Sequence, residues 1–387
     1  MNLKKNEKVF NFDDVDHKVY ILNKGKIRLF IRAGNKECPL YILDEPNTIF
    51  GIVENVLDVK RLIAAQTIDD DNIITPIEIW GRKLFDTVTV NPKLGLQLAI
   101  FQAVALQKTN AQLTNLSKTL NEIKNKTNEL CINYYEACEA INELNNKYKY
   151  PWLKAIYEQA RQSLIYQYGN SAKAGKDVLD EMAPEAQQKI AASVEKENLE
   201  NTTSKVYKAG EVLCNEGELG KEMYILLDGE LSVYVNNNKV AEITKKGEVI
   251  GEIAVLLGIK TKTFEKRTAT VKVKKDAKIV SIPAAKIIEV ISKDPKIIVH
   301  TLKTLSERIP ESYNKLTEIY DKMDKAINLM NPRAATSATC PKAYQQLIAL
   351  IEQKSNDREK VDSILKNLQK WIDLSKESYS KFSAVYE

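Results

Sequence analysis

Similar sequence segments recur in this chain about 200 residues apart. The segment 20–31, YILNKGKIRLFI, matches 224–235, YILLDGELSVYV, at an offset of 204 positions. Asn-Pro-Lys at 91–93 returns as Asp-Pro-Lys at 294–296, and the apolar residues after both prolines agree at an offset of 203. In a chain of 387 residues, such a repeat predicts two copies of one domain plan rather than one large core.

Short runs of alternating apolar and polar residues make up the first part of each copy. In the second copy, apolar residues alternate on both sides of Asp228 and Gly229, which predicts a β-hairpin with a tight turn at this pair. Further turn signals lie at Asn236–Asn238 and Lys245–Gly247. Short strands at this regular spacing predict a small antiparallel barrel or roll.

A long helix is predicted after each proline, over 92–130 and 295–330. Apolar residues recur there in steps of three and four, which is typical of a heptad stripe, although Thr109, Thr127 and Ser312 interrupt it. The stripes allow three arrangements: pairing of the two helices within one chain as a pseudo-dimer, a homodimer, or a helix that covers its own barrel. The repeated apolar residues are Leu106, Leu113, Leu116, Leu120 and Ile123 in the first copy, and Ile309, Leu316, Ile319, Met323 and Ala326 in the second.

The remaining segments are predicted to be mainly helical. Residues 131–168 form an amphipathic pattern broken at Pro151, and Trp371 and Tyr379 share the apolar face of the last helix. We therefore predict an α+β protein with two antiparallel β-roll (jelly-roll-like) barrels, each followed by a long helix and further α-helices. The expected domains are a barrel at 1–105, a helical region and connector at 106–203, a barrel at 204–310 and a helical region at 311–387. Shorter helices are expected near 178–182, 184–194, 342–355 and 358–385.

One stretch of the second copy has the features of a ribose-phosphate pocket. Gly251 permits close approach of the backbone to a ligand, and the helix that follows it offers free amide groups to an anion. Glu252 can accept a hydrogen bond from a sugar hydroxyl, and Arg267 can hold a phosphate with its planar guanidinium.

On these residues, 204–310 resembles a cyclic nucleotide-binding domain, as in the catabolite activator protein family and the regulatory subunits of the cAMP-dependent kinase. The resemblance implies that Gly251 and Glu252 meet the ribose, that Ile253 and Ala254 offer backbone amides, and that Arg267 with Thr268 holds the cyclic phosphate. It implies cAMP, cGMP or another cyclic nucleotide as ligand. The matching residues are Gly210, Gly217, Tyr224, Gly229, Gly247, Gly251, Glu252, Arg267, Thr268 and Ala269.

The two copies depart from the family pattern in different ways. In the second, Arg267 lies fifteen positions after Glu252, farther than is usual, and the extra segment 260–266 can loop out, admit a bulkier nucleotide or mark a disused pocket. In the first, Ile52 replaces the carboxylate, and residues 66–76 offer three aspartates and no matching arginine. We interpret the first copy as a barrel that has lost nucleotide binding, and Asp69–Asp71 as a solvated loop rather than a metal site.

Composition and missing motifs argue against several classes of function. A net charge of +5 and the absence of a basic recognition helix argue against DNA binding, and no segment is apolar enough for a signal peptide or a membrane span. Five cysteines without metal spacing indicate reduced thiols in a cytoplasmic protein. No catalytic motif appears, and His300 is expected to be a packing residue. We expect a non-enzymatic sensor that signals to a protein partner through its helices; the alternative is a scaffold that binds no nucleotide.

Overall fold

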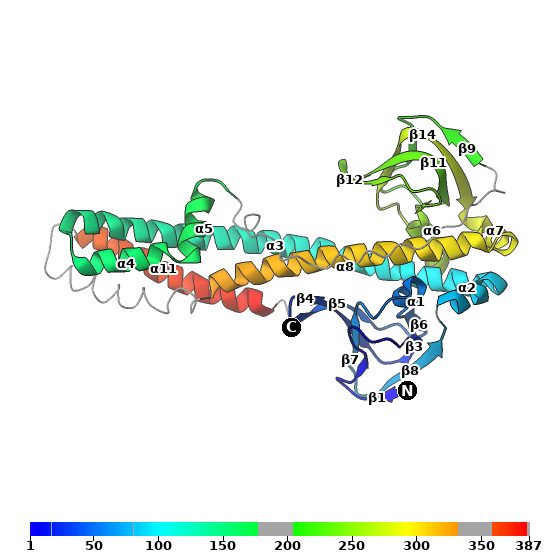
Figure 1. The fold of residues 1–387 in the computed structure, drawn as a ribbon, viewed down its shortest axis with the longest axis horizontal. Coiled ribbons are helices and arrows are strands. Elements are labelled where there is room, and N and C mark those ends of the chain that lie inside the picture. Colours follow the sequence, from blue (N-terminus) through cyan, green and yellow to red (C-terminus); the bar gives the residue numbers. More distant parts are fainter. Residues whose placement is uncertain (17, 80, 177–203, 332–357, 385–387) are drawn as a thin grey trace. The chain divides into compact units, whose positions relative to one another are not determined.

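The computed structural model describes residues 1–16, 18–79, 81–176, 204–331 and 358–384 (Figure 1). The chain divides into two compact units. The first takes in residues 1–32, 39–113 and 189–315, and the second 33–38, 114–188 and 316–387. Several predicted features lie outside the described residues: the helices at 178–182, 184–194 and 342–355, together with His17 and Cys340.

The N-terminal strands form two four-stranded antiparallel sheets, in the orders β1-β8-β3-β6 and β2-β7-β4-β5. Ile27, Leu29 and Ile31 of β4 are buried and alternate with more exposed residues, because successive side chains of a strand point to opposite faces. The strands are β1 (Asn2–Leu3), β2 (Lys8–Phe10), β3 (Lys18–Lys24), β4 (Ile27–Ala33), β5 (Lys36–Leu43), β6 (Thr48–Phe50), β7 (Ala64–Thr67) and β8 (Asn72–Glu78). Helix α1 (Val53–Leu57) follows β6, and α2 (Gly81–Val90) follows β8.

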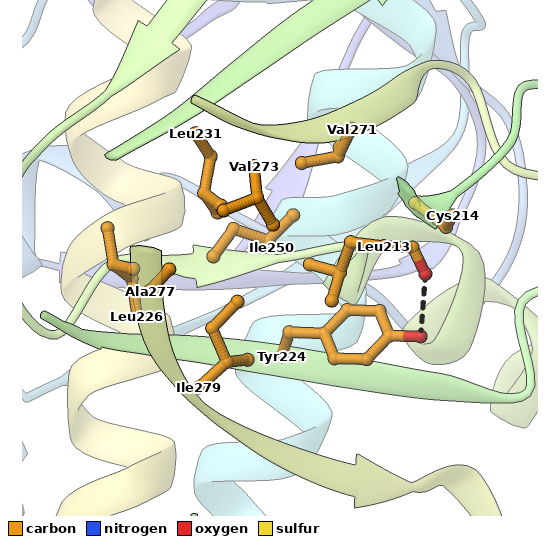
Figure 2. Packing of buried hydrophobic residues seen from close by; sticks show 10 residues of the cluster. All are labelled: Leu213, Cys214, Tyr224, Leu226, Leu231, Ile250, Val271, Val273, Ala277 and Ile279. Atoms are coloured by element: carbon orange, nitrogen blue, oxygen red, sulfur yellow. Dashed lines mark hydrogen bonds between the residues drawn. The ribbon is translucent and has the colours of Figure 1, made fainter. Parts of the chain in front are cut away.

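The second set of strands forms one six-stranded sheet in the order β10-β14-β11-β12, with β13 paired to β11 and β9 to β14. Its core is apolar, and the hydroxyl of Tyr224 donates to the Leu213 carbonyl at 3.3 Å within it (Figure 2). The elements are β9 (Ser204–Tyr207), β10 (Val212–Cys214), β11 (Glu222–Val235), β12 (Asn238–Ile243), β13 (Val249–Ile250), α6 (Glu252–Thr261), β14 (Thr270–Pro283), the 3-10 turn η1 (Ala284–Lys286) and α7 (Ile287–Lys293). The α+β fold predicted from the sequence is confirmed.

The hairpin predicted at Asp228–Gly229 is wrong. Strand β11 runs unbroken through both residues and pairs with β14 along its length, with register shifts between Leu226 and Leu231. Gly229 has a φ of +104°, so the glycine makes a bulge in a continuous strand instead of a chain reversal. The reversal comes at Asn236 and Asn237, whose φ values of +49° and +63° suit the turn that joins β11 to β12.

Two long helices, α3 (Pro92–Tyr148) and α8 (Lys296–Met330), follow the two sets of strands. Within the first unit they contact each other directly. The amide of Gln102 donates to the Ser306 hydroxyl, and the Ser312 hydroxyl donates to Asn110 at 3.4 Å. Both pairs join residues about 203 positions apart, which is the offset of the sequence repeat, so the helices run parallel and nearly in register (Figure 1).

The second unit contains the distal part of α3 together with shorter helices. Helix α3 ends just before Pro151, where α4 (Pro151–Arg161) begins, and α5 (Leu164–Lys173) follows. In α11 (Arg358–Ser383), the buried Trp371 packs against Tyr134 of α3, with ring centroids 5.4 Å apart. None of the helices in the described parts of the chain has a stretch apolar and long enough to cross a bilayer.

The bulge in β11 generates a stability prediction. Gly229→Ala should weaken the second barrel more than Gly217→Ala. Both glycines have positive φ, so both alanines introduce backbone strain of about 1–2 kcal/mol. Only at Gly229 would the new β-carbon also lie 2.5 Å from the Ala277 α-carbon, whereas the space around Gly217 is open. Hydrogen exchange of the β11 and β14 amides measures the difference; equal loss of protection in the two variants would contradict it.

Candidate functional site

A left-handed glycine opens the candidate site. Gly251 has a φ of +72° and is the N-cap of α6, and a β-carbon at this position would collide with Nη1 of Arg267. Only glycine satisfies both demands. Because Gly251 turns the chain into α6, the first amides of that helix, including those of Ile253 and Ala254, lie beside it without intrahelical acceptors.

Arg267 is turned into the protein, with 6% of its surface exposed. Its Nη1 donates to the Gly251 carbonyl at 2.8 Å and its Nη2 to the Glu222 carbonyl at 2.5 Å. Its Nε is buried and has no hydrogen-bond partner in the described part of the chain, where Arg267 also forms no ion pair with a carboxylate. The side chain therefore holds a positive charge against neutral carbonyl groups, with donor capacity to spare.

The ring of Tyr224 lies against this cation, 5.5 Å from the guanidinium carbon. Burial, followed by its hydrogen bond to Glu222, raises the pKa of Tyr224, so the hydroxyl stays protonated. Its single proton is shared between the Glu222 carboxylate at 2.8 Å and the Leu213 carbonyl at 3.3 Å. Tyr224 and Glu222, joined by the shorter of these hydrogen bonds, thus line one side of the guanidinium.

Glu252 is the first residue of α6 and is only 1% exposed. Its Oε1 pairs with Arg308, which reaches it from α8. Eight positions earlier on the same helix, Nε2 of the buried His300 meets the Gly247 carbonyl, so His300 packs as predicted. The sequence did not reveal Arg308, because the contact joins residues 56 positions apart.

The other residues of the predicted site lie at the start of α6 and directly after Arg267. Ile253 and Ala254 are buried, Thr268 is exposed and Ala269 is partly buried. The extra segment lengthens α6 as far as Thr261, and Lys262 ends the helix with a left-handed φ of +58°. Lys266 then forms a β-bridge with Leu219, which returns the chain to Arg267.

The first barrel contains an arginine in the equivalent position, which the sequence comparison missed. Gly51 has the same φ of +72° as Gly251, and Nη1 of Arg61 donates to its carbonyl at 3.0 Å. The prediction of no matching arginine is wrong, because Arg61 lies ten positions after Gly51 whereas Arg267 lies sixteen after Gly251. The extra segment 260–266 of the second copy changes the offset between the two arginines, so a fixed offset places the equivalent residue beyond Arg61.

Carboxylates neutralise the arginine of the first barrel. Arg61 pairs with Asp16 at 2.6 Å and with the buried Glu54 at 3.3 Å, and Phe10 lies 4.4 Å from its guanidinium carbon. Ile52 stands where the second barrel has Glu252. Glu54 thus supplies from within the protein the negative charge that a phosphate would bring.

The space beside Gly51 is small. The cavity there has a volume of about 40 Å³ and is lined by Gly51, Glu54, Phe101, Gln102 and Tyr313 among others. This volume suits a few water molecules rather than a nucleotide. The aspartates of the loop at 69–71 do not build a metal site: Asp71 pairs with Lys24, and the described residues contain no cluster of three His, Cys, Asp or Glu side chains suited to a metal.

The two arginines should differ in what their removal does to stability. Arg61→Met leaves Glu54 buried without its cation, and breaking a buried pair in this way costs about 3–5 kcal/mol. Arg267→Met removes a cation that has no carboxylate partner among the described residues, so its effect should be smaller. Chemical denaturation of both variants measures the difference, and Glu54→Gln should partly rescue Arg61→Met but not Arg267→Met. An equal loss for both arginines would contradict the electrostatic distinction.

Comparison with known proteins matches the second barrel to one family. The model for the cyclic nucleotide-binding domain matches residues 204–294. A cAMP-dependent protein kinase regulatory subunit from Schizosaccharomyces pombe is 28% identical over 104 residues, which are 27% of this chain and 23% of that protein. A cyclic nucleotide-gated channel from Caenorhabditis elegans is 26% identical over 149 residues, 34% of this chain and 19% of the channel. The chain thus spans less than a quarter of the length of either relative.

Among solved structures, a cAMP-bound PfPKA-R is similar to 76% of this chain and 73% of its own, with 17% identity and a TM-score of 0.26. The regulatory domain of Toxoplasma gondii PKA with cAMP matches 80% of this chain and 85% of its own, with 13% identity and a TM-score of 0.22. The family match at residues 204–294 identifies the second barrel as a cyclic nucleotide-binding domain.

Proposed function

We propose that the second barrel binds a cyclic nucleotide, or a related small phosphate ligand, and that this chain is a non-enzymatic sensor. The observation that carries the proposal is the buried charge of Arg267. A buried cation without a carboxylate partner is unfavourable, and an anionic ligand relieves it. The equivalent Arg61 already has two carboxylates, so the proposal applies to the second barrel alone.

The residues around Arg267 suit the remaining parts of such a ligand. The first amides of α6, at Ile253 and Ala254, offer an anion the positive end of a helix. The carboxylate of Glu252 can accept from a ribose hydroxyl, and Thr268 places a further hydroxyl at the exposed edge of the site. Gly251 keeps side-chain atoms out of the approach to the backbone.

Helix α8 provides a route from this site to the rest of the chain. It contacts the loop through His300 at Gly247 and through Arg308 at Glu252, and its Ser306 contacts α3. In our proposal the ligand shifts the population of two α8 arrangements, which differ in the contacts made by Arg308. The paired helices would then display a surface to a protein partner. Among the described residues, four free, buried cysteines support a cytoplasmic location.

A scaffold that binds no nucleotide is the second candidate. Two observations favour it: Glu252 already has an ion-pair partner in Arg308, and the first barrel satisfies its arginine internally. In that function, both barrels and their helices would serve assembly only. The titration below separates the two candidates.

Isothermal titration of the intact chain should detect binding of cyclic AMP, cyclic GMP or a cyclic dinucleotide, and Arg267→Ala should abolish it. At a ligand concentration of about 100 times Kd, binding should add about 2.7 kcal/mol to stability and raise the melting temperature. Arg32→Ala, which removes a half-exposed arginine on the first barrel, is the control and should bind normally. Equal affinity in Arg267→Ala would refute the assigned phosphate contact, and no binding by the unaltered chain would favour the scaffold.

The parallel contact of α3 and α8 also supports an intramolecular pseudo-dimer. Because the apolar stripe of each helix then meets the other within one chain, we predict a monomer of 43.8 kDa by light scattering across a range of concentrations. A dimeric mass that persists on dilution would instead support a homodimer through these stripes.

A further inference from the structure

The ion pair of Glu252 and Arg308 joins the candidate sugar contact to the helix that follows the barrel. We infer that Arg308 competes with a ligand's ribose 2′-hydroxyl for the Glu252 carboxylate, and so sets the affinity for ribose-containing ligands. The inference rests on the proposed function, since it requires that a nucleotide binds. It assigns a role in ligand affinity to Arg308, which lies on α8 outside the loop at Gly251. The size of this effect depends on whether the sugar has a 2′-hydroxyl.

The pair is asymmetric, and Arg308 is the partner able to leave. Glu252 is fixed in the first turn of α6, is 1% exposed and lies where a helix N-terminus favours negative charge. The Arg308 side chain is 36% exposed, and its guanidinium lies at the end of a long aliphatic stem. A hydroxyl that takes over the carboxylate can therefore release the guanidinium into water.

A second contact keeps α8 in place when that pair opens. His300 lies two helical turns before Arg308 and meets the Gly247 carbonyl, which is independent of Glu252. Gly247 has a φ of +79°, and a β-carbon there would lie 2.6 Å from the His300 ring. The helix is thus packed closely against the loop at this point, and release of Arg308 need not undock it.

The competition has a specific chemical signature. Because Glu252 is 1% exposed, a ligand with a 2′-hydroxyl has to displace a group that covers the carboxylate, and Arg308 is the partner on its Oε1. A 2′-deoxy ligand makes no such contact and leaves the pair intact. Removing the guanidinium should therefore strengthen binding of the first ligand only. A purely structural role for Arg308, in holding α8 to the barrel, would alter the affinity for both ligands alike.

The test is titration of the intact chain and its Arg308→Met variant with cyclic AMP and with 2′-deoxy cyclic AMP. Arg308→Met should bind cyclic AMP about tenfold more tightly, which corresponds to ~1.4 kcal/mol. Its affinity for the deoxy analogue should not change. Lys315→Met is the matched control, because it makes the same change of charge seven positions farther along α8, on an exposed side chain, and should leave both affinities unchanged.

A further variant covers the risk that Arg308→Met disturbs folding by leaving Glu252 unpaired. Glu252→Gln/Arg308→Met removes both charges but keeps a neutral acceptor, so its preference for cyclic AMP over the deoxy analogue should be smaller than that of Arg308→Met. Unchanged or weaker binding of cyclic AMP by Arg308→Met, or equal tightening for both nucleotides, would overturn the competition and leave the proposed function standing. No binding by the unaltered chain or any variant would overturn both.

Discussion

A buried guanidinium that donates to the carbonyl of a left-handed glycine is the contact on which both barrels depend. It joins Arg61 to Gly51 and Arg267 to Gly251, at 3.0 Å and 2.8 Å. In each barrel the same glycine turns the chain from a strand into a short helix. The contact therefore fixes the position of a helix N-terminus next to a permanent positive charge. That combination favours anions, whether they come from the protein or from solution.

The two barrels surround this positive charge with different groups. In the first, Asp16 and Glu54 supply carboxylates, and the neighbouring cavity has a volume of only about 40 Å³. In the second, the described residues near Arg267 present carbonyl oxygens and a tyrosine ring, and Nε is left without a partner. Two acidic side chains, Asp16 and Glu54, thus distinguish the surroundings of the two arginines, although both guanidinium groups donate to a left-handed glycine.

Local sequence signals predicted much of this fold. The proline-initiated helices and the turn predicted at Asn236–Asn238 depend on residues close together in the chain, and the sequence contains them directly. The signal at Asp228–Gly229 failed because a bulge and a tight turn both require glycine at positive φ, and only the partner strand β14 distinguishes them. Arg61 was missed because an insertion changed the spacing between the copies.

Contacts between distant residues account for the rest of what the sequence did not show. Arg308 meets Glu252, and Glu54 meets Arg61, only once the helices have packed against their barrels. No local sequence pattern predicts the partner of an isolated arginine on a helix or of a glutamate in a short apolar run. The predicted residues of the loop were recognisable because a backbone motif requires them, whereas these ion pairs arise from tertiary packing.

The orphaned Nε of Arg267 also has a consequence for how long the protein survives. A buried charge without a counterion lowers the stability of the domain that contains it, and proteases act on transiently opened segments. A ligand that supplies the counterion would suppress this opening, whereas the first barrel would stay closed regardless. The abundance of the protein would then follow the supply of its ligand, so that turnover itself becomes a second output of the same site.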